Sequence, residues 1–160
     1  MTFHDASLDD VAVVEALLGR ALSGRFAVVV RRLDGRPVVI ENEPHLRDGT
    51  PMPTLFWLVD PELHDAVSRL ESDGGVHRFE ELVDENELRR AHDEYATRRQ
   101  LATVRADLVQ ASGGVGGTRV GVKCLHAHLA NYLVGAQDPV GSLVAGTLDV
   151  TGLTVIDVRG

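Results

Sequence analysis

Residues 112–131 (SGGVGGTRVGVKCLHAHLAN) gather most of the residue types that could do chemistry in this chain. A run of glycines leads to two cations and the only cysteine, and two histidines follow directly. A thiol beside imidazoles is typical of nucleophilic and metal-binding sites, whereas glycines beside cations favour an anionic ligand. This stretch is therefore the candidate functional site, with Cys124, His126 and His128 as candidate catalytic residues.

The glycines and cations predict a binding site for a small anionic ligand, such as a phosphorylated compound. Glycine lacks a Cβ and lets the backbone approach a ligand closely, and the first amides of a helix have no partner within that helix. We expect a helix whose first turns already include Arg119, Lys123 and Cys124. The expected ligand-binding residues are Gly113, Gly114, Gly116, Gly117, Arg119 and Lys123.

The same helix start predicts an acidic thiol, because the helix amides and Lys123 would favour the thiolate of Cys124. On a regular helix Cys124, His128 and Asn131 share one stripe, so His128 would lie near the thiol. His126 would point about 200° away from both. In the alternative interpretation Cys124 is a small buried apolar residue without a chemical role.

No metal site and no cofactor are predicted. Cys124 and His128, four residues apart, could supply two zinc ligands, but zinc needs at least a third. That ligand would have to come from a distant position such as His45 or His92, and the chain has no second paired-ligand motif. The positive charge of Lys123 beside the thiol would also repel a metal cation.

Several motifs, in order along the chain, resemble the bacterial family called domain of unknown function 501. They are PHLRDGTPMPTLFWL (44–58), DPELHDAVSRLE (60–71), AHDEYATRR (91–99), GGVGGTR with VKCLHAH, and DPVG (138–141). In the family's pattern KCLH is steadier than the second histidine, which implies a role for His126 more than for His128.

The family resemblance implies no established activity, and it adds an alternative function. Genes of the family often lie beside those for a septum-formation-initiator-like protein and an exopolyphosphatase. This association implies a non-enzymatic protein-interaction module in cell division or envelope processes. The two hypotheses are thus a small-ligand site with cysteine and histidine chemistry, and an interaction module.

Length and composition limit the class of protein. The 160 residues, 44% of them hydrophobic, suffice for a single domain, 1–160, with its own core. A net charge of −8 disfavours nucleic acid and acidic membrane surfaces as partners. The sequence has no apolar run of membrane-spanning length and no signal-peptide pattern, and one cysteine excludes an intrachain disulfide. We therefore expect a cytoplasmic protein without membrane insertion.

The order of the expected elements predicts an α+β fold: a small, largely antiparallel sheet packed with helices on one face. A long amphipathic helix, from 85 to about 109, carries apolar residues at every seventh position and could pack within the chain or form a homo-oligomer. Strands are expected at 25–32 and 37–41, joined by a turn at Asp34-Gly35, and at 54–59 and 153–158. Further helices are expected from 8, from the start signal Asp60-Pro61, briefly at 79–83, and from the first turns that carry Arg119 up to Gly135, after which Asp138-Pro139 predicts a turn.

Overall fold

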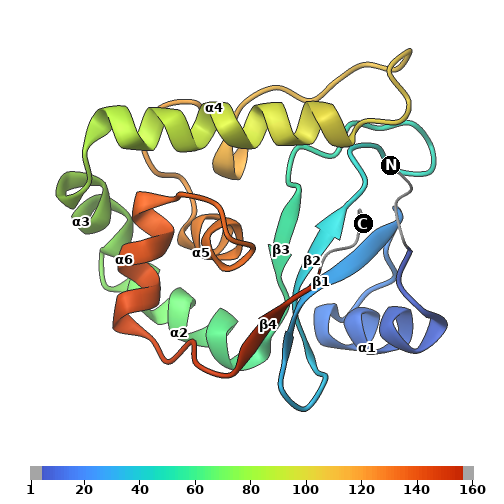
Figure 1. The fold of residues 1–160 in the computed structure, drawn as a ribbon, viewed down its shortest axis with the longest axis horizontal. Coiled ribbons are helices and arrows are strands. Elements are labelled where there is room, and N and C mark those ends of the chain that lie inside the picture. The colour runs from blue at the N-terminus through green and yellow to red at the C-terminus, as the bar shows by residue number, and fades with distance from the viewer. Residues whose placement is uncertain (1–4, 157–160) are drawn as a thin grey trace.

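The computed structural model describes residues 5–156, which form six α-helices, one short 3-10 helix and a four-stranded sheet (Figure 1). This confirms the predicted α+β class. The elements are α1 (Leu8–Leu18), β1 (Phe26–Arg32), β2 (Pro37–Asn42), β3 (Phe56–Leu58), α2 (Pro61–Ser72), α3 (Gly75–Leu82), α4 (Glu85–Ala102), η1 (Val115–Gly117), α5 (Leu125–Leu133), α6 (Pro139–Thr147) and β4 (Leu153–Val155).

The sheet has the strand order β3-β2-β1-β4, and all neighbouring strands are antiparallel. β1 and β2 form the predicted hairpin, in which the Gly35 amide donates to the Arg32 carbonyl at 2.9 Å. Gly35 has a φ of +90°, which a residue with a Cβ rarely adopts. β4 adds to the free side of β1, with Val155 opposite Val30. The last residues of the predicted strand, 157 and 158, lie outside the described residues.

Helices cover both faces of the sheet, which corrects the prediction of one covered face. α1 packs through Val14 against a small cluster that includes Phe26, Val28 and Ile40. The helices α2 to α6 lie on the other side of the sheet, around the larger core (Figure 1). The apolar stripe of α1 predicts that the helix packs, but it carries no information about which face of the sheet receives it.

The long helix α4 ends at Ala102, earlier than predicted. Its end is marked by Thr103, whose hydroxyl donates to the Arg99 carbonyl at 3.1 Å and competes with a further helical turn. The buried face of α4 packs within the chain, so its apolar stripe is used there. That face consists of Leu88, Ala91, His92, Tyr95 and Arg99. A homo-oligomer through this helix stays a prediction.

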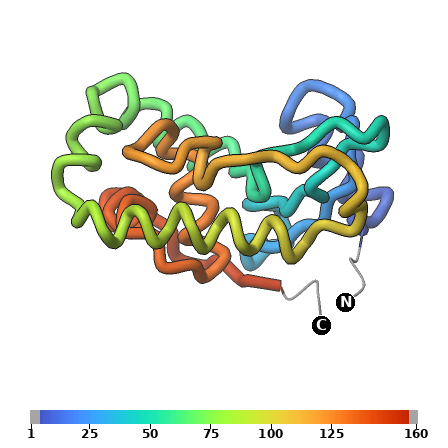
Figure 2. Tube along the Cα trace, turned by 90° about the horizontal axis from the view of Figure 1, so that it is seen from above, coloured from blue at the N-terminus to red at the C-terminus, as the bar shows by residue number. Residues whose placement is uncertain are grey.

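After α4 the chain reverses, and residues 103–124, here called the return segment, run back alongside the helix towards α5 (Figure 2). α5 begins only at Leu125, so the residues expected in its first turns belong to the return segment instead. α6 begins at Pro139, where only a turn was predicted, because the Asp138 carboxylate caps the helix by accepting from the Gly141 amide at 2.9 Å. Within residues 5–156, no helix is both long and apolar enough to cross a membrane.

Candidate functional site

Two buried side chains of α4 hold the return segment in place. His92 accepts from the Val115 amide through Nδ1 (3.1 Å) and donates to the Gly121 carbonyl through Nε2 (2.9 Å). The guanidinium of Arg99 donates to the Gly113 carbonyl at 2.8 Å. Both side chains lie on the face of α4 that the sequence assigned to packing. They fix the backbone just before α5 and therefore position the candidate site.

The glycine run forms a tight turn pressed against α4. A Cβ on Gly114 would lie 2.6 Å from the Cβ of His92, so no larger residue fits there. The amide of Gly114 donates to the Thr118 carbonyl (2.8 Å), and that of Gly117 donates to the Gly114 carbonyl (3.0 Å). These two amides already have partners, so they are not open donors for a ligand. Anion binding by the glycine run stays a prediction.

Cys124 is the residue before α5 and has an extended backbone, with φ −148° and ψ 119°. It is therefore not part of the helical stripe from which the sequence argument placed it beside His128. Its Sγ lies 3.9 Å from Nδ1 of His126, so the prediction that His126 points away from the thiol is wrong. Gly116, with a φ of +69°, lies so near that a Cβ on it would be 3.7 Å from the Cβ of Cys124, and both residues line the same pocket.

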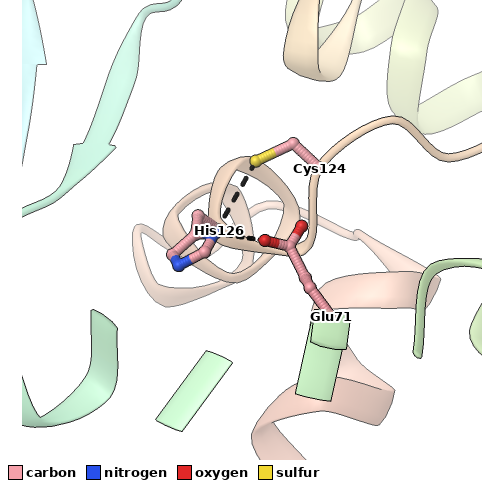
Figure 3. Close-up of side chains that lie close together, drawn as sticks. All are labelled: Glu71, Cys124 and His126. Carbon is pink, nitrogen blue, oxygen red and sulfur yellow. Dashed lines mark hydrogen bonds and ion pairs between the residues drawn. The ribbon is translucent and has the colours of Figure 1, made fainter. Parts of the chain in front are cut away.

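Glu71, at the end of α2, completes a cluster with Cys124 and His126 (Figure 3). Its Oε1 lies 2.9 Å from Nδ1 of His126, and its Oε2 accepts from the Leu125 amide at 3.1 Å. A carboxylate of the chain thus occupies the helix start, where the sequence argument expected an external anion. Sequence reasoning missed Glu71 as a site residue; its one signal was its place in the motif DPELHDAVSRLE.

The second nitrogen of His126 faces α2. Nε2 lies 3.1 Å from the carbonyl oxygen of His64 and 3.1 Å from the hydroxyl of Ser68. A carbonyl oxygen can only accept, so this contact requires a proton on Nε2. The ring also contacts the ring of His64, with centroids 4.5 Å apart and the planes tilted by 39°. The orientation of His126 is therefore fixed, and its Nδ1 is directed at Glu71 and Cys124.

The thiol and the imidazole lie on the wall of a pocket of about 400 Å³. Its apolar wall comes from Leu18 and the residues of β3, including Trp57, and Arg20 and His64 contribute further polar groups. The guanidinium of Arg20 lies over the Trp57 ring, 5.3 Å from its centroid. The sequence did not identify this pocket, because its walls come from separate parts of the chain.

The thiol of Cys124 is not the acidic group that was predicted. Burial is the largest influence and raises its pKa, and the negative charge of Glu71 acts in the same direction. The backbone amides of the first turn of α5 and the charge of Lys123 lower the pKa but are outweighed. The cysteine is therefore a protonated thiol at neutral pH.

The two cations expected to bind an anion together lie in different surroundings. Lys123 is exposed beside Cys124, whereas Arg119 pairs with Asp93 of α4 at 3.3 Å. Arg119 lines a second cavity of about 470 Å³ against α4, and it is not among the residues lining the pocket of Cys124. The structure thus brings Gly116, Cys124 and His126 together and places Arg119 elsewhere.

His128, the other predicted catalytic histidine, is fully buried and does not line the pocket. Its Nδ1 donates to the carboxylate of Asp138 at 2.8 Å, and the Asn131 amide donates to the same carboxylate at 3.0 Å. Its Nε2 has no hydrogen-bond partner among the described residues. His128 therefore connects α5 with the start of α6.

Comparison with known proteins gives one match. The sequence model of the family described as "Protein of unknown function (DUF501)" matches residues 28–146, a span that contains Glu71, Cys124 and His126. No curated protein and no solved structure matches the chain. Because the family match covers most of the chain, as the sequence motifs indicated, this protein belongs to the DUF501 family.

Proposed function

We propose that this protein binds a small anionic molecule in the pocket beside the start of α5, and that Cys124 and His126 contact its reactive end. The observation that carries the proposal is a thiol and an imidazole, 3.9 Å apart, on the wall of a pocket of about 400 Å³. Pockets of this size that combine an apolar wall with a few convergent polar groups are typical small-molecule sites.

The lining of the pocket indicates the kind of molecule. Trp57 and its neighbours in β3 offer a flat apolar wall to an apolar or aromatic body. Arg20 lies at this wall, and within residues 5–156 its guanidinium forms no ion pair with a carboxylate. A guanidinium without a carboxylate partner favours a carboxylate or phosphate group on the ligand. Lys123, the exposed residue before Cys124, adds positive charge near the thiol.

Cys124 and His126 would act on the reactive end of the bound ligand. Cys124 would be the nucleophile, and His126 would take up the proton of its thiol, as in other thiol–imidazole pairs. The motifs PTLFWL, DPELHDAVSRLE and VKCLHAH, which carry the family resemblance, all contribute residues to this pocket or to the cluster on its wall. This convergence supports a role of the pocket in this protein.

The only tryptophan of the chain lines the pocket, so its fluorescence can report binding. We expect phenyl phosphate or benzoate to change the Trp57 emission saturably, and neutral benzyl alcohol to bind more weakly. Arg20→Gln should weaken binding of phenyl phosphate roughly tenfold or more, because a charge-assisted hydrogen bond is lost. Bound ligand should also slow the labelling of Cys124 by iodoacetamide.

Arg119→Gln is the matched control, because Arg119 lines the other cavity. Its affinity for phenyl phosphate should equal that of the wild type. If this variant weakens binding as much as Arg20→Gln does, the anion site lies at the glycine turn instead. If no anionic probe changes the Trp57 emission, the proposal is wrong.

A further inference from the structure

We infer that Glu71, Cys124 and His126, whose side chains lie close together (Figure 3), form a zinc-binding site that opens into the pocket. In the sequence, Cys124 pairs with His128 and has no third ligand in its motif. The structure replaces His128 by His126 and adds a carboxylate from α2. The binding of zinc is inferred from these three side chains alone. The further claim that the zinc ion contacts an anionic ligand depends on the proposed function.

The separations of the donor atoms fit one metal ion. Oε1 of Glu71 and Sγ of Cys124 lie 2.9 Å and 3.9 Å from Nδ1 of His126, and the three donor atoms lie within 4.8 Å of one another. Tetrahedral zinc with bonds of about 2.0–2.3 Å separates neighbouring ligand atoms by roughly 3.3–3.6 Å. The observed distances lie on both sides of this range, so small side-chain rotations would bring all three atoms to one ion.

The orientation of His126 also fits a metal ligand. Because the His64 carbonyl requires the proton on Nε2, the neutral ring directs the lone pair of Nδ1 at the cluster. Histidine ligands typically donate their other N–H to a carbonyl or carboxylate in this way. Glu71 is oriented similarly, since its second oxygen accepts from the Leu125 amide. Both ligands therefore have the outer contacts that hold a metal site in shape.

A zinc ion would replace the proton of the Cys124 thiol and any proton between Nδ1 and the carboxylate, and its charge would hold the three donor atoms together. Thiolate and carboxylate together balance the charge of Zn²⁺, and Lys123 is exposed, where solvent screens its repulsion.

The ligand set fits a transition metal such as zinc and leaves one coordination position open. Thiolate and imidazole favour zinc over magnesium or calcium, which prefer oxygen ligands. Three protein ligands with a free fourth position are the pattern of catalytic zinc, whereas structural zinc has four. Cys124 and His126 both line the pocket, so the free position faces it. In a protein of net charge −8, this ion would be a strong local attraction for an anionic ligand.

The test uses the full chain, purified without chelator and analysed for zinc, then titrated with ZnCl₂ against a chromophoric chelator. We expect about one zinc per chain. Glu71→Gln, Cys124→Ser and His126→Asn should each lower zinc affinity by more than roughly 100-fold, beyond the roughly 10–100-fold typical of outer-contact losses. Ser68→Ala, which removes only an outer contact of His126, should have a smaller effect. His77→Asn, at an exposed position of α3, should bind like the wild type.

Cobalt provides a second readout, a spectrum that identifies the ligand atom without a measurement of affinity. Co²⁺ bound to the wild type should show a sulfur-to-metal charge-transfer band that Cys124→Ser lacks. Circular dichroism confirms that each variant is folded. Absence of zinc and cobalt binding by the folded wild type, or undiminished zinc affinity in Cys124→Ser, would overturn the inference.

The zinc site and the proposed function can fail separately. If zinc does not bind but phenyl phosphate still changes the Trp57 emission, the pocket stands and Cys124 remains the candidate nucleophile. If zinc binds through the three residues but the zinc-loaded protein ignores phenyl phosphate and benzoate, the metal site stands and the anionic ligand is wrong.

Discussion

Two histidines of the same helix form the same kind of contact in two different surroundings. His126 meets Glu71 at 2.9 Å, with side-chain exposures of 18% and 26%, whereas His128 meets Asp138 at 2.8 Å, with 0% for both. Residue types and distances are nearly equal. The difference lies in access and in what else surrounds each pair. An imidazole–carboxylate contact therefore indicates a functional site only together with its surroundings.

The carboxylate of Asp138 is fully used by donors of the fold. It accepts from His128, from Asn131 and from the amide of Gly141, so its lone pairs serve the junction of α5 and α6. The Glu71 cluster, by contrast, adds a thiol and is partly exposed, with Cys124 and His126 on the wall of a pocket. The first arrangement stabilises the fold, and the second leaves donor atoms available to a ligand. The following predictions test this distinction, from the largest expected effect on stability to the smallest.

Asp138→Ala should cause the largest loss of stability. It removes the helix cap of α6 and leaves the buried donors of His128 and Asn131 without an acceptor. We expect the free energy of unfolding to fall by about 3 kcal/mol or more. Urea unfolding followed by circular dichroism measures this. A loss below about 1 kcal/mol would show that the junction does not depend on the carboxylate.

Stability should also fall as the pH falls, through His92, which packs against His128. Burial is the largest influence on His92 and lowers its pKa below the usual value of 6.5, and the charge of His128 acts in the same direction. The Gly121 carbonyl and the carboxylates of Asp138 and Asp93 raise the pKa but are outweighed. Between the lowered pKa and 6.5 the unfolded chain binds the proton and the folded chain does not, so acid favours unfolding. This contribution is fully present above 6.5 and is lost as the pH falls towards the folded-state pKa.

The measurement compares urea unfolding of the wild type and His92→Gln between about pH 7.5 and 5.5, around the usual histidine pKa. The stability advantage of the wild type should shrink as the pH falls. A constant or growing advantage would mean that His92 is not held neutral by burial. His77→Gln, at an exposed position, serves as the control for histidine titration in general.

Glu71→Gln should have the smallest effect on stability. The glutamine carbonyl can still accept from the Leu125 amide, and partly exposed ion pairs contribute little. We expect the free energy of unfolding to change by less than about 1 kcal/mol, while zinc affinity is lost. A loss as large as that of Asp138→Ala would place the Glu71 cluster with the structural network and remove the distinction.

Local signals in the sequence determined much of the fold. Asp34-Gly35 predicted the hairpin, because a positive φ is accessible to glycine, and Asp60-Pro61 predicted the start of α2 through a cap and a proline in the first turn. The same cap-and-proline signal at Asp138-Pro139 was interpreted as a turn, although it begins α6. The start of α5 was also placed too early, because a glycine-rich approach does not define where helical geometry begins.

The sequence likewise identified the stretch that carries the thiol and both histidines, and the family motifs favoured His126. Only the tertiary structure decided which partners these residues have. Packing of α2 against α5 brings Glu71 to His126, and the fold places Trp57 of β3 and Arg20 beside the thiol. A ligand set built from separate elements leaves no spacing pattern in one sequence, because its geometry depends on how the elements pack and not on their order along the chain.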